Sequence, residues 1–248
     1  MRTFLALLPA VILAAAPVAA QEPSVDLNDP ARAAEDRARD THSKPIEVFE
    51  WIGLEPGDIV VDFHAGSGYN TWIMSKWVGP EGVVYTEMPE SMSENLRTRL
   101  ESGDLADAGN VIYVDDVAAL PTDSLDVFFT SRNYHDVDAA EIPQFLTEVR
   151  RALRPGGLFV VIDARAAEGR DEEAHRIADQ VVIEEVTAAG FELVEQSEML
   201  AYPEDDHVGP KWDQREQLDQ SLIKFSAPDD PAEPAEPAPP AEEAPTGS

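Results

Sequence analysis

The residues best suited to chemistry lie in one short segment that joins a hydrophobic run to a glycine-bearing turn. Residues 60–69 read Val-Val-Asp-Phe-His-Ala-Gly-Ser-Gly-Tyr, a pattern typical of a buried strand that leads through a turn into a helix. Gly66 and Gly68 would let the backbone approach a ligand closely, and the start of the helix would offer free N–H groups. The segment therefore predicts a ligand-binding turn, although such a glycine pair also occurs in plain tight turns.

Two further acidic residues follow the next two hydrophobic runs. Glu87 comes directly after the run that begins at Val83, and Asp116 follows the run 111–114. A carboxylate at the first position can accept both hydroxyl protons of a ribose, and one at the second could reach an adenine amino group. Each acid alone could be a solvated loop charge. Together with Asp62, they place acids at three consecutive strand ends and favour a nucleoside site.

Hydrophobic runs alternate with helical stretches through most of the chain, which predicts a parallel sheet covered on both faces. The strand candidates are Ile59 to Phe63, Val83 to Thr86, Val111 to Val114, Leu125 to Thr130 and Leu158 to Ile162. Right-handed crossovers would wind them into an open α/β sheet of the doubly wound, Rossmann-like kind. In such sheets ligands bind at the carboxyl ends of the strands, where the glycines and acids are expected to meet.

Both ends of this region have a different pattern. Asp29-Pro30 predicts the start of a charged helix to about Thr41, followed by a second helix over 46–52 that closes at Gly53. After a predicted helix over 171–189, residues 191–199 and 221–225 read as two strands with no helix between them, so they should pair antiparallel. The intervening stretch 203–218 predicts a loop or an ordered flap.

The two termini are expected to lie outside the folded domain, which we place at 29–225. Residues 1–20 read as a cleaved signal peptide, with Arg2 before an apolar stretch and small residues before Gln21, and an uncleaved membrane anchor is the alternative. Residues 21–28 read as a linker. Residues 226–248 are rich in Pro, Ala, Glu and Asp and predict a disordered acidic tail. The expected location is periplasmic or secreted, with no stable membrane insertion after cleavage.

Charge and composition limit the classes of partner. The chain has 49 acidic and 18 basic residues and a formal net charge of −31, so it should repel nucleic-acid backbones. Because it contains no cysteine, disulfides and thiolate metal sites are excluded. His42, His175 and His207 lie far apart in sequence without metal-ligand spacing, so no metal site is predicted. The sequence does not indicate an oligomeric state.

With these motifs in place, the chain resembles the class I S-adenosylmethionine (SAM) dependent methyltransferases, and more narrowly a group of exported bacterial members. The resemblance covers roughly 36–225. It rests on these segments: Asp36-Arg37-Ala38-Arg39-Asp40 with Lys44-Pro45, the Asp-x-x-x-Gly-x-Gly turn, Asn133-Tyr134-His135-Asp136, and Arg151-Ala152-Leu153-Arg154-Pro155-Gly156-Gly157. It implies a seven-stranded sheet with an antiparallel terminal strand, which agrees with the hairpin inferred above.

The resemblance also implies roles for individual residues toward SAM. Asp62, Ala65, Gly66 and Gly68 would line its methionine and ribose side, while Glu87 would hold the ribose and Asp116 the adenine. The sequence departs from the family pattern at His64, where a glycine is usual. The imidazole could narrow the methionine pocket, or it could simply pack beside the turn.

Methyl transfer from a sulfonium is an in-line displacement, so alignment of the reacting atoms is the main requirement. If the acceptor must lose a proton, His135 is the candidate base, with Asn133, Tyr134 and Asp136 as orienting groups; plain loop packing is the alternative. Arg37 and Arg39 could form a lid, where an arginine would pair with the methionine carboxylate, or could belong to an exposed helix with salt bridges.

Three functions fit these observations. The first is a SAM-dependent methyltransferase that acts on a small molecule or an envelope component. The second is a non-catalytic protein that keeps a SAM or nucleoside pocket, because a fold does not fix a function. The third, an NAD(P)-dependent oxidoreductase, fits Gly66, Gly68 and Glu87 loosely, but its third small position would be Thr71, which packs less closely than glycine.

Overall fold

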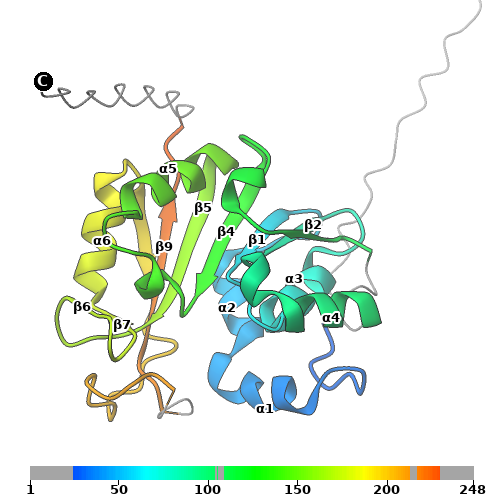
Figure 1. The fold of residues 1–248 in the computed structure, drawn as a ribbon, viewed down its shortest axis with the longest axis horizontal. Helices are drawn as coiled ribbons and strands as arrows, with labels where there is room; N and C mark the ends of the chain where they lie inside the picture. The colour runs from blue at the N-terminus through cyan, green and yellow to red at the C-terminus, as the bar shows by residue number, and fades with distance from the viewer. Residues whose placement is uncertain (1–24, 104, 106–108, 213–216, 230–248) are drawn as a thin grey trace, which may run out of the picture.

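The computed structural model describes residues 25–103, 105, 109–212 and 217–229. The predicted signal peptide at 1–20 and most of the predicted tail lie outside these residues. The described chain forms one seven-stranded sheet with helices on both faces (Figure 1), in the strand order β3-β2-β1-β4-β5-β9-β8. The predicted α/β, doubly wound fold is therefore confirmed.

The strands of the sheet are β1 (Ile59–Phe63), β2 (Val83–Glu87), β3 (Val111–Val114), β4 (Leu125–Ser131), β5 (Leu153–Ala164), β8 (Glu192–Gln196) and β9 (Gln220–Ser226). The strands β1 to β5 pair parallel, and β9 pairs antiparallel with both β5 and β8. The predicted antiparallel terminal pair is thus confirmed. Strand β1 lies between β2 and β4, so the winding of the chain reverses at the β1–β4 boundary.

The helices are α1 (Ala34–Ser43), α2 (Pro45–Ile52), α3 (Tyr69–Val78), α4 (Glu94–Ser102), α5 (Ile142–Ala152) and α6 (Asp179–Ala188). Short 3₁₀ turns are η1 (Glu90–Met92), η2 (Val117–Ala119) and η3 (Tyr134–Asp136). The two-residue strands β6 (Arg170–Asp171) and β7 (Arg176–Ile177) form a small separate ribbon.

The pleat of the sheet divides the core into two layers, because successive side chains of a strand point to opposite faces. Val60 lies in the layer that also contains residues of α2 and α3, whereas its neighbour Val61 lies in the layer with α5 and α6. Phe128 and Phe129 divide in the same way. Strands buried on both faces explain why these runs are continuously hydrophobic rather than alternating.

The predicted helix over 171–189 is wrong in its first half, since α6 begins only at Asp179. The β6–β7 ribbon takes its place. Its turn is held by the Asp171 carboxylate, which accepts the Ala174 N–H at 2.8 Å, and His175 has a positive φ of 55°. Arg176 is completely buried against Asp205. Long-range ion pairing therefore overrides the local helical pattern.

The first predicted helix also starts later than expected, at Ala34 rather than Pro30. The Asp29 carboxylate accepts the Ala31 N–H at 2.8 Å and so holds a separate turn ahead of the helix. Val25 and Leu27, which fall in the predicted linker, pack against the core. At the other end Ala227 is buried and donates its N–H to Gly157.

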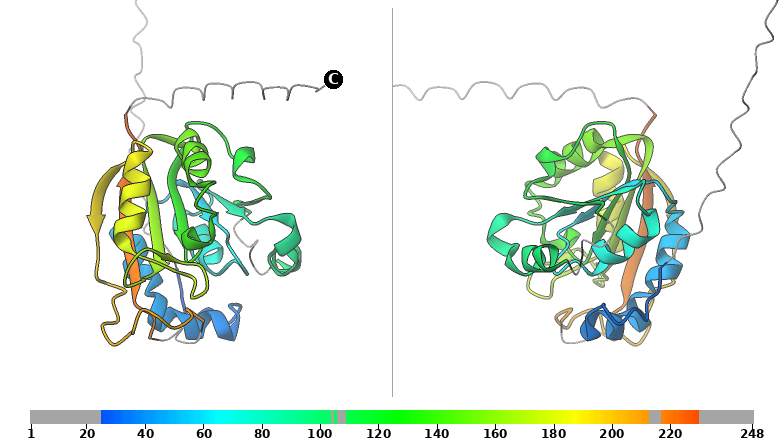
Figure 2. Two further views of the ribbon diagram at one scale, coloured as in Figure 1. Left: turned by 60° about the vertical axis from the view of Figure 1, so that its left-hand side comes forward. Right: turned by 90° about the vertical axis from the view of Figure 1, so that its right-hand side faces the viewer.

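Two segments far apart in sequence lie at the same edge of the sheet. Helix α1 and the described parts of the connection from β8 to β9, 197–212 and 217–219, lie below the sheet in Figure 1, and the two views of Figure 2 agree. This is the edge at which β1 and β4 end. Within the described part of the chain, no helix combines the length and apolar character needed to cross a bilayer.

Candidate functional site

A cavity of about 260 Å³ lies at the carboxyl ends of β1 and β4, where the winding reverses. Four residues predicted to bind the cofactor and one predicted to orient the acceptor line it together: Asp62, His64, Ala65, Gly66 and Asn133. The remaining lining residues are Arg39, Ser67, Asn70, Ser131, Arg132, Lys211 and Trp212. The sheet therefore brings five of the eleven predicted site residues to this cavity, and six do not line it: Gly68, Glu87, Asp116, Tyr134, His135 and Asp136.

The glycine turn is hydrogen-bonded to the neighbouring strand, and its two glycines have different surroundings. The Ala65 N–H donates to the Glu87 carbonyl at 2.9 Å. Gly66 has a φ of 60°, and a Cβ built on it would meet no atom within 4 Å, so its backbone faces open space. Gly68 has a φ of 84°, and a Cβ there would lie 2.5 Å from a methyl of Leu105. Gly66 is thus open to a ligand, whereas Gly68 is required for packing.

The acids at the first two strand ends are both buried. Asp62 accepts the Thr71 hydroxyl at 2.6 Å, and desolvation raises its pKa to about 6. Glu87 is 2% exposed and accepts the His64 backbone N–H at 3.1 Å. Desolvation raises the pKa of Glu87 to about 7, since the His64 hydrogen bond compensates only in part. Thr71, the third small position that an NAD(P)-binding turn would need, thus donates its hydroxyl to Asp62.

Asp116 lies outside the cavity. It is exposed, and its carboxylate accepts the Ala118 N–H at 2.7 Å as the cap of η2. Its charge nevertheless contributes to the raised pKa of Glu87. Of the three strand-end acids Asp62 alone lines the cavity, so the structure does not bring all three into the common crevice that the sequence predicted.

His64 lines the cavity without filling it. Its φ is 50°, and its ring stacks on that of Phe63 with centroids 4.3 Å apart and planes 18° from parallel. Burial lowers the pKa of the imidazole. The ring therefore packs beside the turn, and His64 also forms part of the cavity wall.

The cavity wall carries three cations, Arg39, Arg132 and Lys211, against one acidic lining residue, Asp62, among the described residues. Arg39 comes from α1, and its guanidinium lies over the Tyr69 ring at 4.1 Å from the centroid. Its charge acts on Asp62 to lower that carboxyl's pKa, against the larger effect of desolvation. Positive charge is therefore concentrated here in a chain of net charge −31.

The rest of α1 is fixed by ion pairs to neighbouring segments. Asp36 pairs with Arg99 at 2.8 Å, and Asp40 pairs with Arg32 at 2.6 Å. Arg37 donates to the backbone carbonyls of Asp29 and Arg32, away from the cavity. Of the two arginines considered for a lid, Arg39 alone lines the cavity.

His135 lies behind the cavity wall. It is 3% exposed, and its Nδ1 lies 2.6 Å from an Asp163 carboxylate oxygen whose partner oxygen accepts the His135 backbone N–H. Its Nε2 lies 3.1 Å from Asp136 and 2.8 Å from Lys211 Nζ. Burial lowers the His135 pKa, but the carboxylates outweigh it and the pKa is raised. The imidazole itself does not line the cavity, because Lys211 lies between the His135 ring and the cavity.

The two remaining residues of the predicted catalytic motif have different environments. Asn133 lines the cavity, and its side-chain N–H donates to the His64 carbonyl at 3.1 Å. Tyr134 is fully buried in the core, and its hydroxyl donates to Glu185 at 2.9 Å. The geometry of Tyr134 is that of loop packing.

Four residues near the site were not found from sequence: Asp163, His175, Lys211 and Trp212. The sequence carried a signal for Asp163, which ends a strand as Glu87 does. His175 lies far from His135 in sequence, but its Nδ1 is 2.6 Å from Asp136. The sequence spacing therefore gave no indication that His175 approaches His135 and Asp136.

Comparison with known proteins agrees with this geometry. Residues 60–157 match a family described as a methyltransferase domain. The ubiquinone/menaquinone biosynthesis C-methyltransferase UbiE of Shewanella sp. strain ANA-3 is 36% identical over 123 residues, which are 47% of this chain and 46% of that protein. The chain thus spans less than half the length of this relative.

Solved structures extend the similarity across the sheet. A SAM-dependent methyltransferase from Aquifex aeolicus has a TM-score of 0.60 at 21% identity, over 81% of this chain and 95% of that one. The [4+2]-cyclase SpnF has a TM-score of 0.56 at 18% identity, over 81% and 86%. At these identities the likeness shows the fold alone. Residues 60–157 thus match a methyltransferase domain, and the described chain shares its fold with the SAM-dependent methyltransferase from Aquifex aeolicus.

Proposed function

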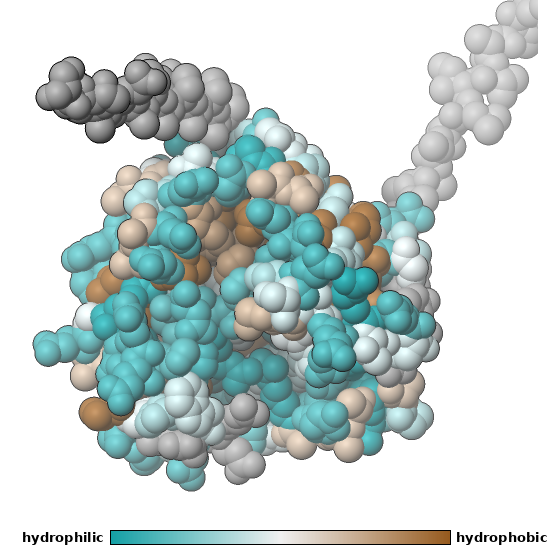
Figure 3. Space-filling view, in the orientation of Figure 1, coloured by the Kyte–Doolittle hydropathy of each residue, from teal (hydrophilic) through white to brown (hydrophobic). Residues whose placement is uncertain are grey.

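We propose that the protein transfers a methyl group from SAM to a small acceptor that carries a negatively charged oxygen. The observation that carries the proposal is the cavity over Gly66, with Arg39, Arg132 and Lys211 in its wall. One cation can pair with the methionine carboxylate of SAM, and the others favour an anionic acceptor. The face of the molecule shown in Figure 3 is largely hydrophilic. Because the chain has a net charge of −31, a cavity wall with three cations is a local exception in charge.

The residues present fit the methionine end of SAM. The cavity of about 260 Å³ is somewhat below the roughly 300–1,000 Å³ of pockets for complete ligands. It is open above Gly66 and lies beside the carboxylate of Asp62. Glu87, buried at the end of the adjacent strand, is the residue to hold the ribose. Bound SAM would supply an electrophilic methyl group on a sulfonium.

The chain's own task is then alignment and charge placement. Arg39 would hold the methionine carboxylate, while Arg132 and Lys211 would stabilise an anionic acceptor oxygen beside the methyl group. An acceptor that arrives ionised needs no base. This suits a site in which His135 is covered by Lys211, which thereby replaces His135 as the group that faces the acceptor.

Two observations favour a second candidate function. The [4+2]-cyclase SpnF has the same fold, and His64 stands where a glycine is usual. The alternative is a protein that binds SAM or a related nucleoside without transferring its methyl group. The relative named for C-methylation in ubiquinone and menaquinone biosynthesis favours methyl transfer to a small organic acceptor.

Thermal-shift measurements test the proposal on the full chain. SAM and S-adenosylhomocysteine at one hundred times their Kd should stabilise the native state by about 2.7 kcal/mol. For a domain of this size that raises Tm by about 5–11 °C. NAD and NADP should leave the Tm unchanged. A rise in Tm with NAD alone would favour an NAD-dependent oxidoreductase over the proposed methyltransferase. S-adenosylhomocysteine release should occur with carboxylic acids, which are ionised at neutral pH, but not with their methyl esters. A SAM shift without any turnover would favour the binding protein.

Arg39→Ala should weaken SAM binding by about 10- to 100-fold, because a charge-assisted pair with the carboxylate contributes about 1.5–3 kcal/mol. The matched ligand is 5′-methylthioadenosine, which has no methionine carboxylate, so its affinity should be unchanged. Titration calorimetry with both ligands measures the difference. Arg97→Ala, an exposed change on α4, is the control variant. Equal losses for the two ligands would show that Arg39 supports the fold rather than the carboxylate.

A further inference from the structure

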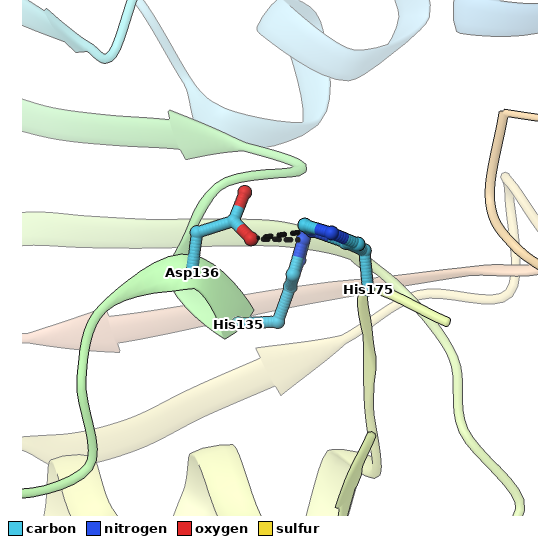
Figure 4. Close-up of side chains that lie close together, drawn as sticks. All are labelled: His135, Asp136 and His175. Atoms are coloured by element: carbon cyan, nitrogen blue, oxygen red, sulfur yellow. Dashed lines mark hydrogen bonds and ion pairs between the residues drawn. The ribbon is translucent and has the colours of Figure 1, made fainter. Parts of the chain in front are cut away.

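Three side chains from two separate segments converge beside the cavity. His135 and Asp136 come from η3, and His175 comes from the turn between β6 and β7 (Figure 4). One ligand atom from each lies within 4.8 Å of the other two. The Asp136 oxygen Oδ1 faces both rings, at 3.1 Å from His135 Nε2 and 2.6 Å from His175 Nδ1.

The spacing of the two imidazole rings is compatible with two ligands on one ion. Their ring centroids lie 5.3 Å apart. Two imidazoles bound to a tetrahedral zinc at about 2.0–2.1 Å have centroids about 5.2 Å apart by simple geometry. Two neutral histidine nitrogens and one carboxylate are also a ligand set that borderline divalent metals accept.

The buried histidine is oriented as metal-bound histidines usually are. The Asp163 carboxylate, which is fully buried, lies 2.6 Å from His135 Nδ1 and also accepts the His135 backbone N–H. Such a carboxylate fixes the tautomer in which Nδ1 carries the proton and Nε2 offers its lone pair. Arg170 donates to the carbonyls of Tyr134, His135 and Val137, which further fixes the turn. The site is therefore organised without a ligand.

The chain itself places a cation at this position. Lys211 Nζ lies 2.8 Å from His135 Nε2 and 3.6 Å from the Asp136 carboxylate. A lone pair and a carboxylate that face the same point require positive charge between them, which the ammonium or a metal ion can supply. Lys211 also donates to the Arg132 carbonyl, so it has a partner when it leaves His135. Lys211 would thus compete with a metal ion for this position and would not bind the ion.

We propose that His135, Asp136 and His175 bind one divalent transition-metal ion of the zinc class, in competition with the Lys211 ammonium. Three protein ligands leave a fourth position for water or another small ligand. Trp212, whose ring lies 4.9 Å from that of His175, and Lys211 both line the cavity, so the metal site borders it. With either the metal ion or the Lys211 ammonium in place, this wall keeps a positive charge beside the acceptor. The proposal concerns metal binding and does not depend on methyl transfer.

Titration calorimetry of the metal-free full chain with Zn²⁺ tests the proposal. One saturable site is expected, and Co²⁺ in its place should give visible absorption bands of a four-coordinate ion. His175→Ala removes a half-exposed ligand and should weaken zinc binding by at least about 100-fold. Lys211→Met removes the competitor and should strengthen it by about tenfold. His42→Ala, which removes a histidine of α1, should leave the affinity unchanged and corrects for adventitious binding.

Several results would overturn the proposal. These are no saturable zinc binding by either the wild type or Lys211→Met, full affinity in His175→Ala with an unaltered melting profile, or equal affinities in Lys211→Met and the wild type. SAM binding, measured by thermal shift on the same His175→Ala sample, should be retained. Failure of the metal site is therefore distinguishable from failure of the proposed function.

Discussion

Arg176→Met is expected to lower the free energy of unfolding by about 3–5 kcal/mol, the usual cost of removing one partner of a buried ion pair. Arg176 and Asp205 are both fully buried in their side chains and form two hydrogen bonds, at 2.9 and 3.0 Å. Methionine fills a similar volume but leaves the Asp205 carboxylate without its counter-charge. That carboxylate also accepts the N–H groups of His207 and Asp219, which cannot neutralise it.

Denaturant unfolding followed by circular dichroism measures the loss, and a fall in Tm of about 6–20 °C should accompany it. The matched control is Arg154→Met, because Arg154 pairs with Asp126 at 2.6 Å but is 51% exposed. Exposed pairs contribute about 0–1 kcal/mol. A loss below about 1 kcal/mol for Arg176→Met would show that the pair is not a principal support of the fold.

The same ion pair explains one of the places where the sequence-based prediction of the fold was wrong. The strands were predictable because burial on both faces imposes continuous hydrophobic runs, and β1 and β3 begin and end where predicted. The stretch 171–178 looks helical locally, but the buried Arg176 needs Asp205, and this partner comes from a segment without regular structure. A single sequence does not reveal such a pairing, since the two residues are separated by all of α6 and β8.

The residues of the candidate site also differ in whether the sequence could predict them. The glycine turn, Asp62 and Glu87 were predictable, because strand order and chain direction bring strand ends to one edge. Lys211 and His175 were not, since Lys211 belongs to the irregular segment 197–212 and His175 to the turn of the β6–β7 ribbon. Asp163 follows the rule for strand-end acids and could have been found. The signal peptide, the export and the acidic tail stay predictions.

Glu87→Gln should weaken SAM binding at pH 8 by about 10- to 100-fold and should remove most of its pH dependence between pH 6 and 8. Hydrogen bonds to a charged group contribute about 1.5–3 kcal/mol, and the ionised carboxylate can accept from both ribose hydroxyls. Because the pKa of Glu87 is about 7, wild-type affinity should rise as the pH increases through this range. Glutamine, which cannot ionise, resembles the protonated acid throughout.

Titration calorimetry at pH 6, 7 and 8 measures the effect, with Glu81→Gln, at an exposed position, as the control. Asp62, with a pKa of about 6, also titrates at the lower end, so only the difference between the wild type and Glu87→Gln is assigned to Glu87. Identical pH profiles for the two proteins would exclude Glu87 as the ribose ligand.

The sign of the stability change gives an independent check on Glu87. Its pKa is raised from 4.5 to about 7 on folding, so the folded state binds more protons between these values than the unfolded state does. The contribution of Glu87 to stability is therefore fully present below pH 4.5 and is lost as the pH rises through 7. Without ligand, Glu87→Gln should unfold at a higher denaturant concentration than the wild type at pH 8, although it binds SAM less tightly. Opposite changes in stability and affinity are expected of a buried acid kept for a ligand, and they would not arise from a residue that only supports the fold.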